Sequence, residues 1–125
     1  MLVTRISLVP TDFLDQIDDI EDNNVDVFVD LEDGSSYTVV VITAKNLVSL
    51  MNKDKMNFTQ PGHPFIIVRK LTQEIIEEAI QAYAEDDAYW FKSYHFAGDV
   101  DIDVFHKLQA EYIESRKELD EFENS

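Results

Sequence analysis

The chain has 125 residues, the length of one domain, and its 45% hydrophobic and 11% aromatic content lets it bury a core rather than stay disordered. It contains no cysteine, which excludes disulfides, thiolate catalysis and cysteine-based metal or iron–sulfur sites. Its formal net charge of −16 at pH 7 repels nucleic acid and anionic lipid and attracts cationic proteins, so we expect neither a nucleic-acid nor a membrane partner.

The charge is unevenly distributed along the chain. Residues 11–33 hold ten acids and no lysine or arginine. Residues 34–72 hold five bases and one acid, and residues 73–125 hold fifteen acids and four bases. Two acidic ends therefore flank a mildly basic middle, which either steers cationic partners to the acidic ends or only keeps a small domain soluble.

We expect a single domain over residues 1–125, with the acidic residues 118–125 free to fray. The first residues lack the basic, apolar and small-residue order of a signal peptide, and no apolar stretch reaches the roughly 20 residues that span a bilayer. A chain without cysteine suits a reducing compartment, so the predicted location is cytoplasmic.

The first predicted elements are a strand and a short helix. In residues 2–9, apolar residues at positions 2, 6 and 8 share one face at period two, and Pro10 ends the strand. Thr11 or Asp12 can cap a helix whose apolar positions are Phe13, Leu14, Ile17 and Ile20. Aspartates inside this helix compete for backbone hydrogen bonds, so it needs packing to persist.

A β-hairpin is the clearest local signal. Aliphatic residues stand at every second position from Val25 to Leu31, between Asp26, Phe28 and Asp30. Asp33-Gly34 favours a two-residue type I′ turn, because both central residues of that turn need positive φ. Such a loop would pair Glu32 with Ser35 and would place on the core face Val25, Val27, Val29, Val40 and Ile42. The return strand, residues 37–42, is apolar on both sides and should lie inside the sheet rather than at its edge.

Next come a short helix and a short strand. Thr43 is the predicted N-cap of the helix, and the side chains that should turn inward are Leu47, Leu50 and Met51. Residues 52–57 are a predicted loop, and turn-forming residues at 60–64 lead into a short buried strand at 65–68.

Helices complete the chain. A helix capped by Thr72 has an apolar stripe made of Ile76, Ala79, Ile80 and Tyr83. Acidic residues 85–87 interrupt the stripe, so a second helix carries Trp90, Phe91 and Tyr94. A last helix is predicted from about Asp101, and its apolar stripe consists of Ile102, Phe105, Leu108, Tyr112 and Leu119. This order predicts an α+β fold with a mostly antiparallel sheet, helices packed on one face and C-terminal helices.

No catalytic motif is evident, so we predict a protein that is not an enzyme and has no catalytic residue, cofactor or metal. Carboxylates alternate from Asp99 to Asp103 as in a calcium loop, but Val104 and Ala110 stand where such a loop needs glycine and glutamate. A remote alternative is a metal-dependent enzyme whose ligands would be His95, Asp103 and His106.

The most suggestive segment runs from Tyr83 to Phe96, where six aromatic residues fall within fourteen positions. One helical stripe cannot bury all six, so some rings should reach the surface beside the carboxylates at 85–87. Tyrosine and tryptophan beside carboxylates suit an interface for partners rich in arginine and lysine. The predicted partner-binding residues are Glu85, Asp86, Asp87, Tyr89, Trp90 and Tyr94. The competing interpretation is two buried helix faces with no partner.

The chain resembles the small acidic immunity proteins that bacteria pair with secreted nuclease toxins. The resemblance rests on this aromatic segment and on the small size, the acidity and the lack of cysteine of the chain. The resemblance implies an inhibitor that binds and neutralises a basic partner, such as a nuclease toxin domain, in the cytoplasm. It concerns general character and transfers no residue role. The alternative is a structural or regulatory interaction protein that acts as a homodimer, with the aromatic segment buried against itself.

Overall fold

A computed structural model describes residues 1–59, 65–99 and 102–123, and their side chains outside residues 96–99. The elements are, in chain order, β1 (Val3–Val9), α1 (Phe13–Gln16), β2 (Asn24–Leu31), β3 (Ser36–Thr43), α2 (Ala44–Asp54), β4 (Phe65–Val68), α3 (Gln73–Tyr83), α4 (Glu85–Asp99) and α5 (Ile102–Glu123). Contacts group the chain into two units, Met1–Tyr94 and His95–Ser125, and the expected single domain over residues 1–125 stays a prediction. The predicted turn at 60–64 and the predicted helix start at Asp101 lie outside the described residues.

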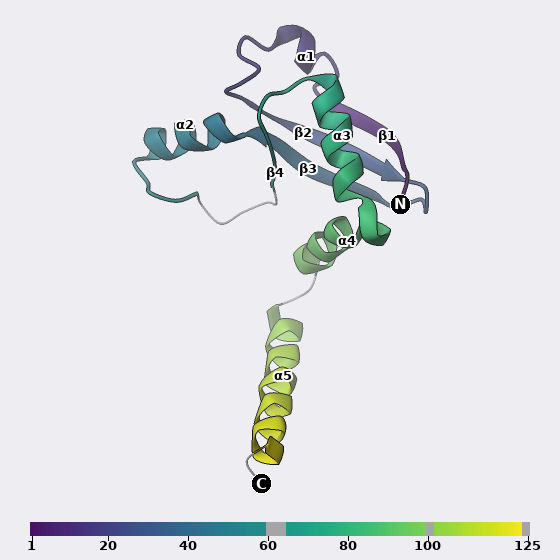
Figure 1. The fold of residues 1–125 in the computed structure, drawn as a ribbon, viewed down its shortest axis with the longest axis vertical. Helices are drawn as coiled ribbons and strands as arrows, with labels where there is room; N and C mark the ends of the chain where they lie inside the picture. Colours follow the sequence, from purple (N-terminus) through teal and green to yellow (C-terminus); the bar gives the residue numbers. More distant parts are fainter. Residues whose placement is uncertain (60–64, 100–101, 124–125) are drawn as a thin grey trace. The chain divides into compact units, whose positions relative to one another are not determined.

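The four strands form one sheet in the order β1-β2-β3-β4 (Figure 1). β1, β2 and β3 are antiparallel neighbours, and β4 runs parallel to β3. Parallel neighbours need a crossover connection, which α2 provides. The prediction of an α+β fold with a mostly antiparallel sheet is confirmed, and so is the interior position of β3.

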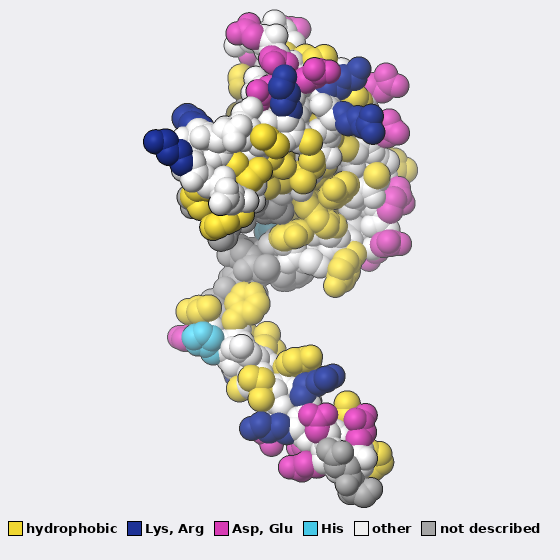
Figure 2. Space-filling model, turned by 60° about the vertical axis from the view of Figure 1, so that its left-hand side comes forward, with side chains coloured by type: hydrophobic (Ala, Val, Ile, Leu, Met, Phe, Trp, Pro, Cys, Tyr) yellow, Lys and Arg dark blue, Asp and Glu magenta, His cyan; other side chains and the backbone are white. Residues whose placement is uncertain are grey.

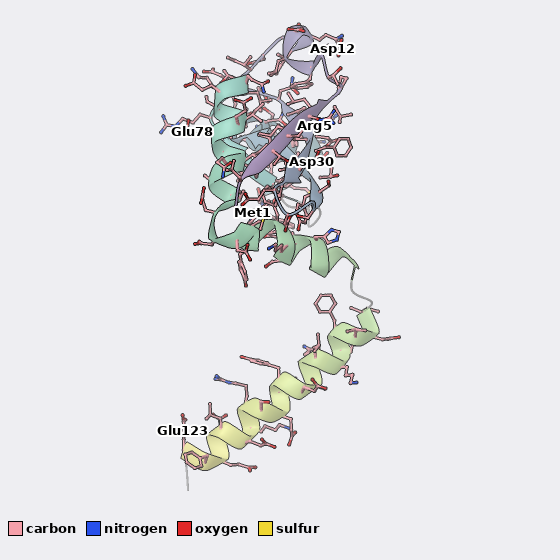
Figure 3. All side chains as sticks on the ribbon, turned by 90° about the vertical axis from the view of Figure 1, so that its right-hand side faces the viewer. Met1, Arg5, Asp12, Asp30, Glu78 and Glu123 are labelled. Carbon is pink, nitrogen blue, oxygen red and sulfur yellow. The ribbon has the colours of Figure 1, made fainter. Side chains whose placement is uncertain are left out.

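One face of the sheet carries the hydrophobic core. α3 lies across this face and contributes Ile76 and Ile80, both 0% exposed. The sheet contributes alternate residues of all four strands, namely Leu8, Val25, Val27, Val29, Leu31, Val39, Val41, Ile66 and Val68. Each such side chain stabilises the fold by about 1.5–3 kcal/mol when it is fully buried. On the opposite face, Arg5 and Asp30 point away from α3 (Figure 3).

The hairpin loop has three residues, not the predicted two. Leu31 N–H donates to the Ser35 carbonyl at 2.9 Å, so Leu31 rather than Glu32 lies opposite Ser35. Gly34 N–H donates to the Leu31 carbonyl at 3.0 Å, and Gly34 has the predicted positive φ, +88°. A turn closed by a left-handed glycine is the usual three-residue hairpin loop.

The extra loop residue makes the predicted register wrong by one. Val27 pairs with Val39 instead of Val40. A shift of one residue turns a strand over, because successive side chains point to opposite faces. Val39 and Val41 therefore enter the core, while Val40 and Ile42 lie on the other face of the sheet.

Two helices have ends that differ from the prediction. α1 stops at Gln16, because Ile17 is extended and the side chain of the N-cap Asp12 accepts from the Gln16 side chain and not from a backbone N–H. The N–H groups at the start of this helix lack a side-chain cap, and its aspartates compete for backbone hydrogen bonds, so the helix remains short. α2 runs further than predicted, to Asp54, where Lys55 in the left-handed conformation closes it.

Polar contacts attach α2 to the rest of the unit. None of the residues Ala44–Asp54, all of them described, is fully buried, and Leu50, which was predicted to turn inward, is 37% exposed. Asp22 accepts hydrogen bonds from Asn46 Nδ2 at 2.9 Å and from Ser49 Oγ at 2.8 Å. These hydrogen bonds, first that of Asn46, lower the pKa of Asp22 below its ordinary value. Thr43 caps the helix as predicted, accepting from Asn46 N–H at 3.1 Å.

The start of the chain is fixed at the end of α3. Gln81 accepts from Val3 N–H at 3.1 Å and donates to the Met1 carbonyl at 2.9 Å. The Met1 amino group donates to the Ala84 carbonyl at 2.9 Å, where the negative end of the helix dipole favours a positive charge. Figure 3 shows Met1 beside the junction of α3 and α4. At the other end of α3, Thr72 is the predicted cap and accepts from the backbone at 3.2 Å.

Gly34→Val should destabilise the protein by about 1–2 kcal/mol. A Cβ at position 34 meets no atom within 4 Å, so the cost comes from the positive φ alone. Gly34→Asn should cost less, because asparagine tolerates the left-handed region. Urea unfolding of the three proteins measures the difference, and a valine variant as stable as the parent would contradict it.

Asp22→Ala should destabilise the protein in a pH-dependent way. A carboxyl whose folded pKa is lowered contributes stability above its unfolded pKa, about 3.9, and loses that contribution as pH falls through the folded pKa. The variant should therefore be less stable than the parent at pH 7 and equal to it at low pH. Urea unfolding between pH 7 and pH 2 measures this, and Asp18→Ala removes the same charge as a control. An equal loss in both variants would assign the effect to net charge.

Candidate functional site

The residues predicted to bind a partner lie together on α4, within the unit Met1–Tyr94. The acidic residues 85–87 form the first turn of α4 and are exposed. Tyr89 is 73% exposed and Tyr94 is 49% exposed, whereas Trp90 is partly buried. We call residues 85–87, 89, 90 and 94, together with Tyr83 of α3, the aromatic–acidic surface.

Trp90 is the centre of an aromatic cluster. Its ring lies edge-on to Tyr83 with centroids 4.8 Å apart, and 4.8 Å from Tyr94. On its inner side it meets Phe91 at 5.1 Å, and Phe91, 2% exposed, lies 5.5 Å from Tyr37 of β3. Each such pair contributes about 0.5–1.5 kcal/mol beyond its burial. A chain of rings therefore runs from the sheet to the surface and holds Trp90 in place.

Tyr89 is not accounted for by core packing. Tyr83 and Tyr94 both contact the ring of Trp90 and so lie on the same side as that ring. Tyr89, one position earlier on the helix than Trp90, is 73% exposed and faces water. The interpretation of two buried helix faces explains Phe91 and Trp90 but leaves Tyr89 without a role. The side chain of Phe96 lies outside the described residues.

A strained turn positions the acidic residues. Asp86, Asp87 and Ala88 are left-handed, with φ of 54°, 58° and 57°. This conformation costs about 1–2 kcal/mol per residue, less for aspartate than for most residues. Ala84, which precedes the turn, and Ala88, its last residue, are both 0% exposed, and Ala88 N–H donates to the Ala84 carbonyl at 3.0 Å, so these two buried residues hold the turn. The predicted break of the helical stripe at 85–87 is confirmed, and the strain lies within the candidate site.

A distant loop adds a carboxylate that sequence reasoning did not place there. Lys92 Nζ lies 3.2 Å from an Asp87 oxygen and 3.9 Å from an oxygen of Asp33 in the β2–β3 loop. Hydrogen bonds from the side chain and backbone of Ser35, and then the charge of Lys92, lower the pKa of Asp33 below its ordinary value. Asp33 is therefore ionised beside α4. No local pattern could have found this contact, because 59 positions separate it from Lys92.

The metal-dependent alternative gains no support. Within residues 1–59, 65–99 and 102–123, no three His, Cys, Asp or Glu side chains gather closely enough to hold a metal ion. His95 belongs to α4, and Asp103 and His106 belong to α5. Asp101 lies outside the described residues. That the protein is not an enzyme stays a prediction.

Asp86→Gly should stabilise the protein, by up to about 1 kcal/mol, because glycine adopts a φ of 54° without a Cβ clash and the side chain is exposed. Glu85→Gly is the matched control, since Glu85 is exposed and is not among the left-handed residues. It should be neutral or destabilising. Urea unfolding compares the two, and an equal effect of both changes would argue against strain at Asp86.

Comparisons with protein-family models, with curated proteins and with solved structures find no match to this chain. The resemblance to immunity proteins therefore remains a hypothesis based on sequence character. What the chain does must be inferred from the geometry and charge of the aromatic–acidic surface.

Proposed function

We propose that the chain acts by binding, as an acidic module that captures a basic protein through the aromatic–acidic surface. The observation that carries the proposal is Tyr89, which is 73% exposed beside three exposed carboxylates at 85–87. A large ring facing water contributes little to folding, whereas such a ring is a common anchor in interfaces.

The surface has the groups that recognise arginine and lysine. A guanidinium can stack on an exposed tyrosine ring, Tyr89 or Tyr94, while its N–H groups donate to a carboxylate of the turn at 85–87. The cluster around Trp90 fixes the helix that presents these groups. A surface that is already ordered loses little conformational entropy on binding, so more of the contact energy appears as affinity.

The charge of the chain supports a basic partner. A net charge of −16 attracts cationic proteins over distances longer than any contact. Of the five bases of the middle segment, Lys45 and Lys53 lie on α2 and Lys55 is its C-cap. The other two, Arg69 and Lys70, lie between β4 and α3. Figure 1 shows α2 leading away from one end of β3, whereas α4 lies toward the other end, where Lys92 is close to Asp33 of the β2–β3 loop. A cation approaching the carboxylates at 85–87 therefore does not meet the lysines of α2, and the nearby Lys92 is already paired with Asp87.

The specific form of the proposal is an immunity protein, an inhibitor that neutralises a basic partner such as a nuclease toxin in the cytoplasm. Small size, acidity and a cysteine-free sequence support it. In the described part of the chain, no helix is both long and apolar enough to cross a bilayer. A homodimer joined through the same surface is the alternative, and it would place the carboxylates of two copies against each other, which costs energy.

The test is to identify a partner by copurification from the native host and to measure binding kinetics at two salt concentrations. Glu85→Gln, Asp86→Asn and Asp87→Asn together should slow association at low salt, because they remove steering charge while the aspartate positions keep residues that tolerate the left-handed turn. Tyr89→Ala should instead speed dissociation by about tenfold, because an aromatic anchor acts once contact is made.

The matched control neutralises three exposed acids of α3, Glu74, Glu77 and Glu78, which changes the net charge equally. It should slow association less than the triple change at 85–87. An acidic partner, or equal effects of both triple variants together with an unchanged dissociation rate for Tyr89→Ala, would contradict the proposal. Loss of the partner's nuclease activity in the complex would support the immunity role.

A further inference from the structure

α5, taken by itself, is a long helix with an uncovered apolar stripe. It spans 22 residues, Ile102–Glu123, and has no buried residue. Exposed apolar residues recur at a spacing of seven, with Phe105 at 39%, Tyr112 at 64% and Leu119 at 47%, and Leu108 lies between them at 53%. In Figure 2 hydrophobic side chains recur along this helix between acidic and basic ones. A lone helix of this length is only marginally stable in water, so a partner surface would stabilise it.

The stripe has the spacing of a coiled-coil seam. With Phe105, Tyr112 and Leu119 at the first position of each heptad (a), Leu108 falls at the fourth (d). Ser115 occupies the next fourth position and weakens the seam. Three heptads with one polar position favour a reversible, concentration-dependent contact rather than a permanent one.

The charges beside the seam point to a second copy of the same helix. In a parallel, in-register pair, a residue at the seventh position (g) faces the residue five places later in the other helix, at its fifth position (e). Glu111 and Arg116 stand in this relation, so each pair of copies would gain two opposite-charge contacts. Glu118 and Glu123 form a like-charge pair near the end of the helix, which lowers the affinity.

An antiparallel pair is less compatible with the same charges. In that orientation seventh positions face each other, so Glu111 would meet Glu118 of the other copy. Arg116 would lie beside Gln109, an uncharged residue. The parallel orientation therefore gains opposite-charge contacts at Glu111, whereas the antiparallel one replaces them with repulsion.

We propose that α5 pairs with α5 of a second copy of the chain as a parallel two-stranded coiled coil, with Phe105, Leu108, Tyr112 and Leu119 in the seam. This proposal does not depend on the proposed function, because it concerns another surface in the unit His95–Ser125. The response to added salt distinguishes this proposal from the proposed function. Two copies of charge −16 repel each other, so added salt should strengthen the dimer, whereas it should weaken binding of a cationic partner.

Sedimentation velocity of the full chain, from low to high micromolar concentration, tests the proposal. The parent should change from monomer to dimer, and Leu108→Glu should abolish the dimer. Ile113→Glu is the matched control, because Ile113 is 47% exposed but lies outside the seam, and it should still dimerise. A parent that stays monomeric over the whole range, or equal losses in both variants, would overturn the proposal.

Charge variants test the orientation. Glu111→Lys should weaken a parallel dimer by about tenfold, because it faces Arg116, and Arg116→Glu should do the same. The double variant Glu111→Lys/Arg116→Glu should restore the parent affinity. A stronger dimer for Glu111→Lys would instead show an antiparallel pair, in which the new lysine meets Glu118, and would overturn the parallel arrangement.

Discussion

In the β2–β3 hairpin, a loop of three residues decides which side chains of β3 face α3. Because side chains alternate along a strand, this register sends Val39 and Val41 into the core together with Val27 and Val29. It also places Tyr37, the partner of Val29, on the core face. Tyr37 is the ring on which Phe91 packs, and Phe91 supports Trp90. A loop shorter by one residue would turn Tyr37 outward and remove the base of the aromatic cluster, so the candidate surface depends on the hairpin register.

The second determinant of the surface is backbone strain that the core supports. Three left-handed residues in succession are unfavourable, and they persist here because the last of them, Ala88, and the preceding Ala84 are fully buried. The turn exposes residues 85–87, and the ring cluster that follows fixes the direction of α4. Packing in the core thus offsets the strain of the turn, and the turn presents carboxylates and an exposed tyrosine in one fixed arrangement. A site arranged in this way suits binding that needs no large conformational change.

Charge gives the two proposed interaction surfaces different physical characters. The aromatic–acidic surface pairs exposed rings with carboxylates, so its attraction to a cation weakens as salt screens it. The seam of α5 is apolar, with a few charged residues beside it, so its association is opposed by the net charge of the chain and is helped by salt. If both proposals hold, the chain would bind a basic partner at one surface and, at higher ionic strength, a second copy of itself at the other.

Features with local causes could be predicted from the sequence. The caps at Thr43 and Thr72, the positive φ of Gly34 and the break of the helical stripe at 85–87 each depend on interactions within a few residues. The six candidate residues on α4 could be named for the same reason, since they are neighbours in the chain. The hairpin register, the burial of Val39 in place of Val40, and the ion pair of Lys92 with Asp33 could not be predicted in this way. These depend on how β3 packs between β2 and β4 under α3, and such contacts join residues far apart in the chain, which no local spacing encodes.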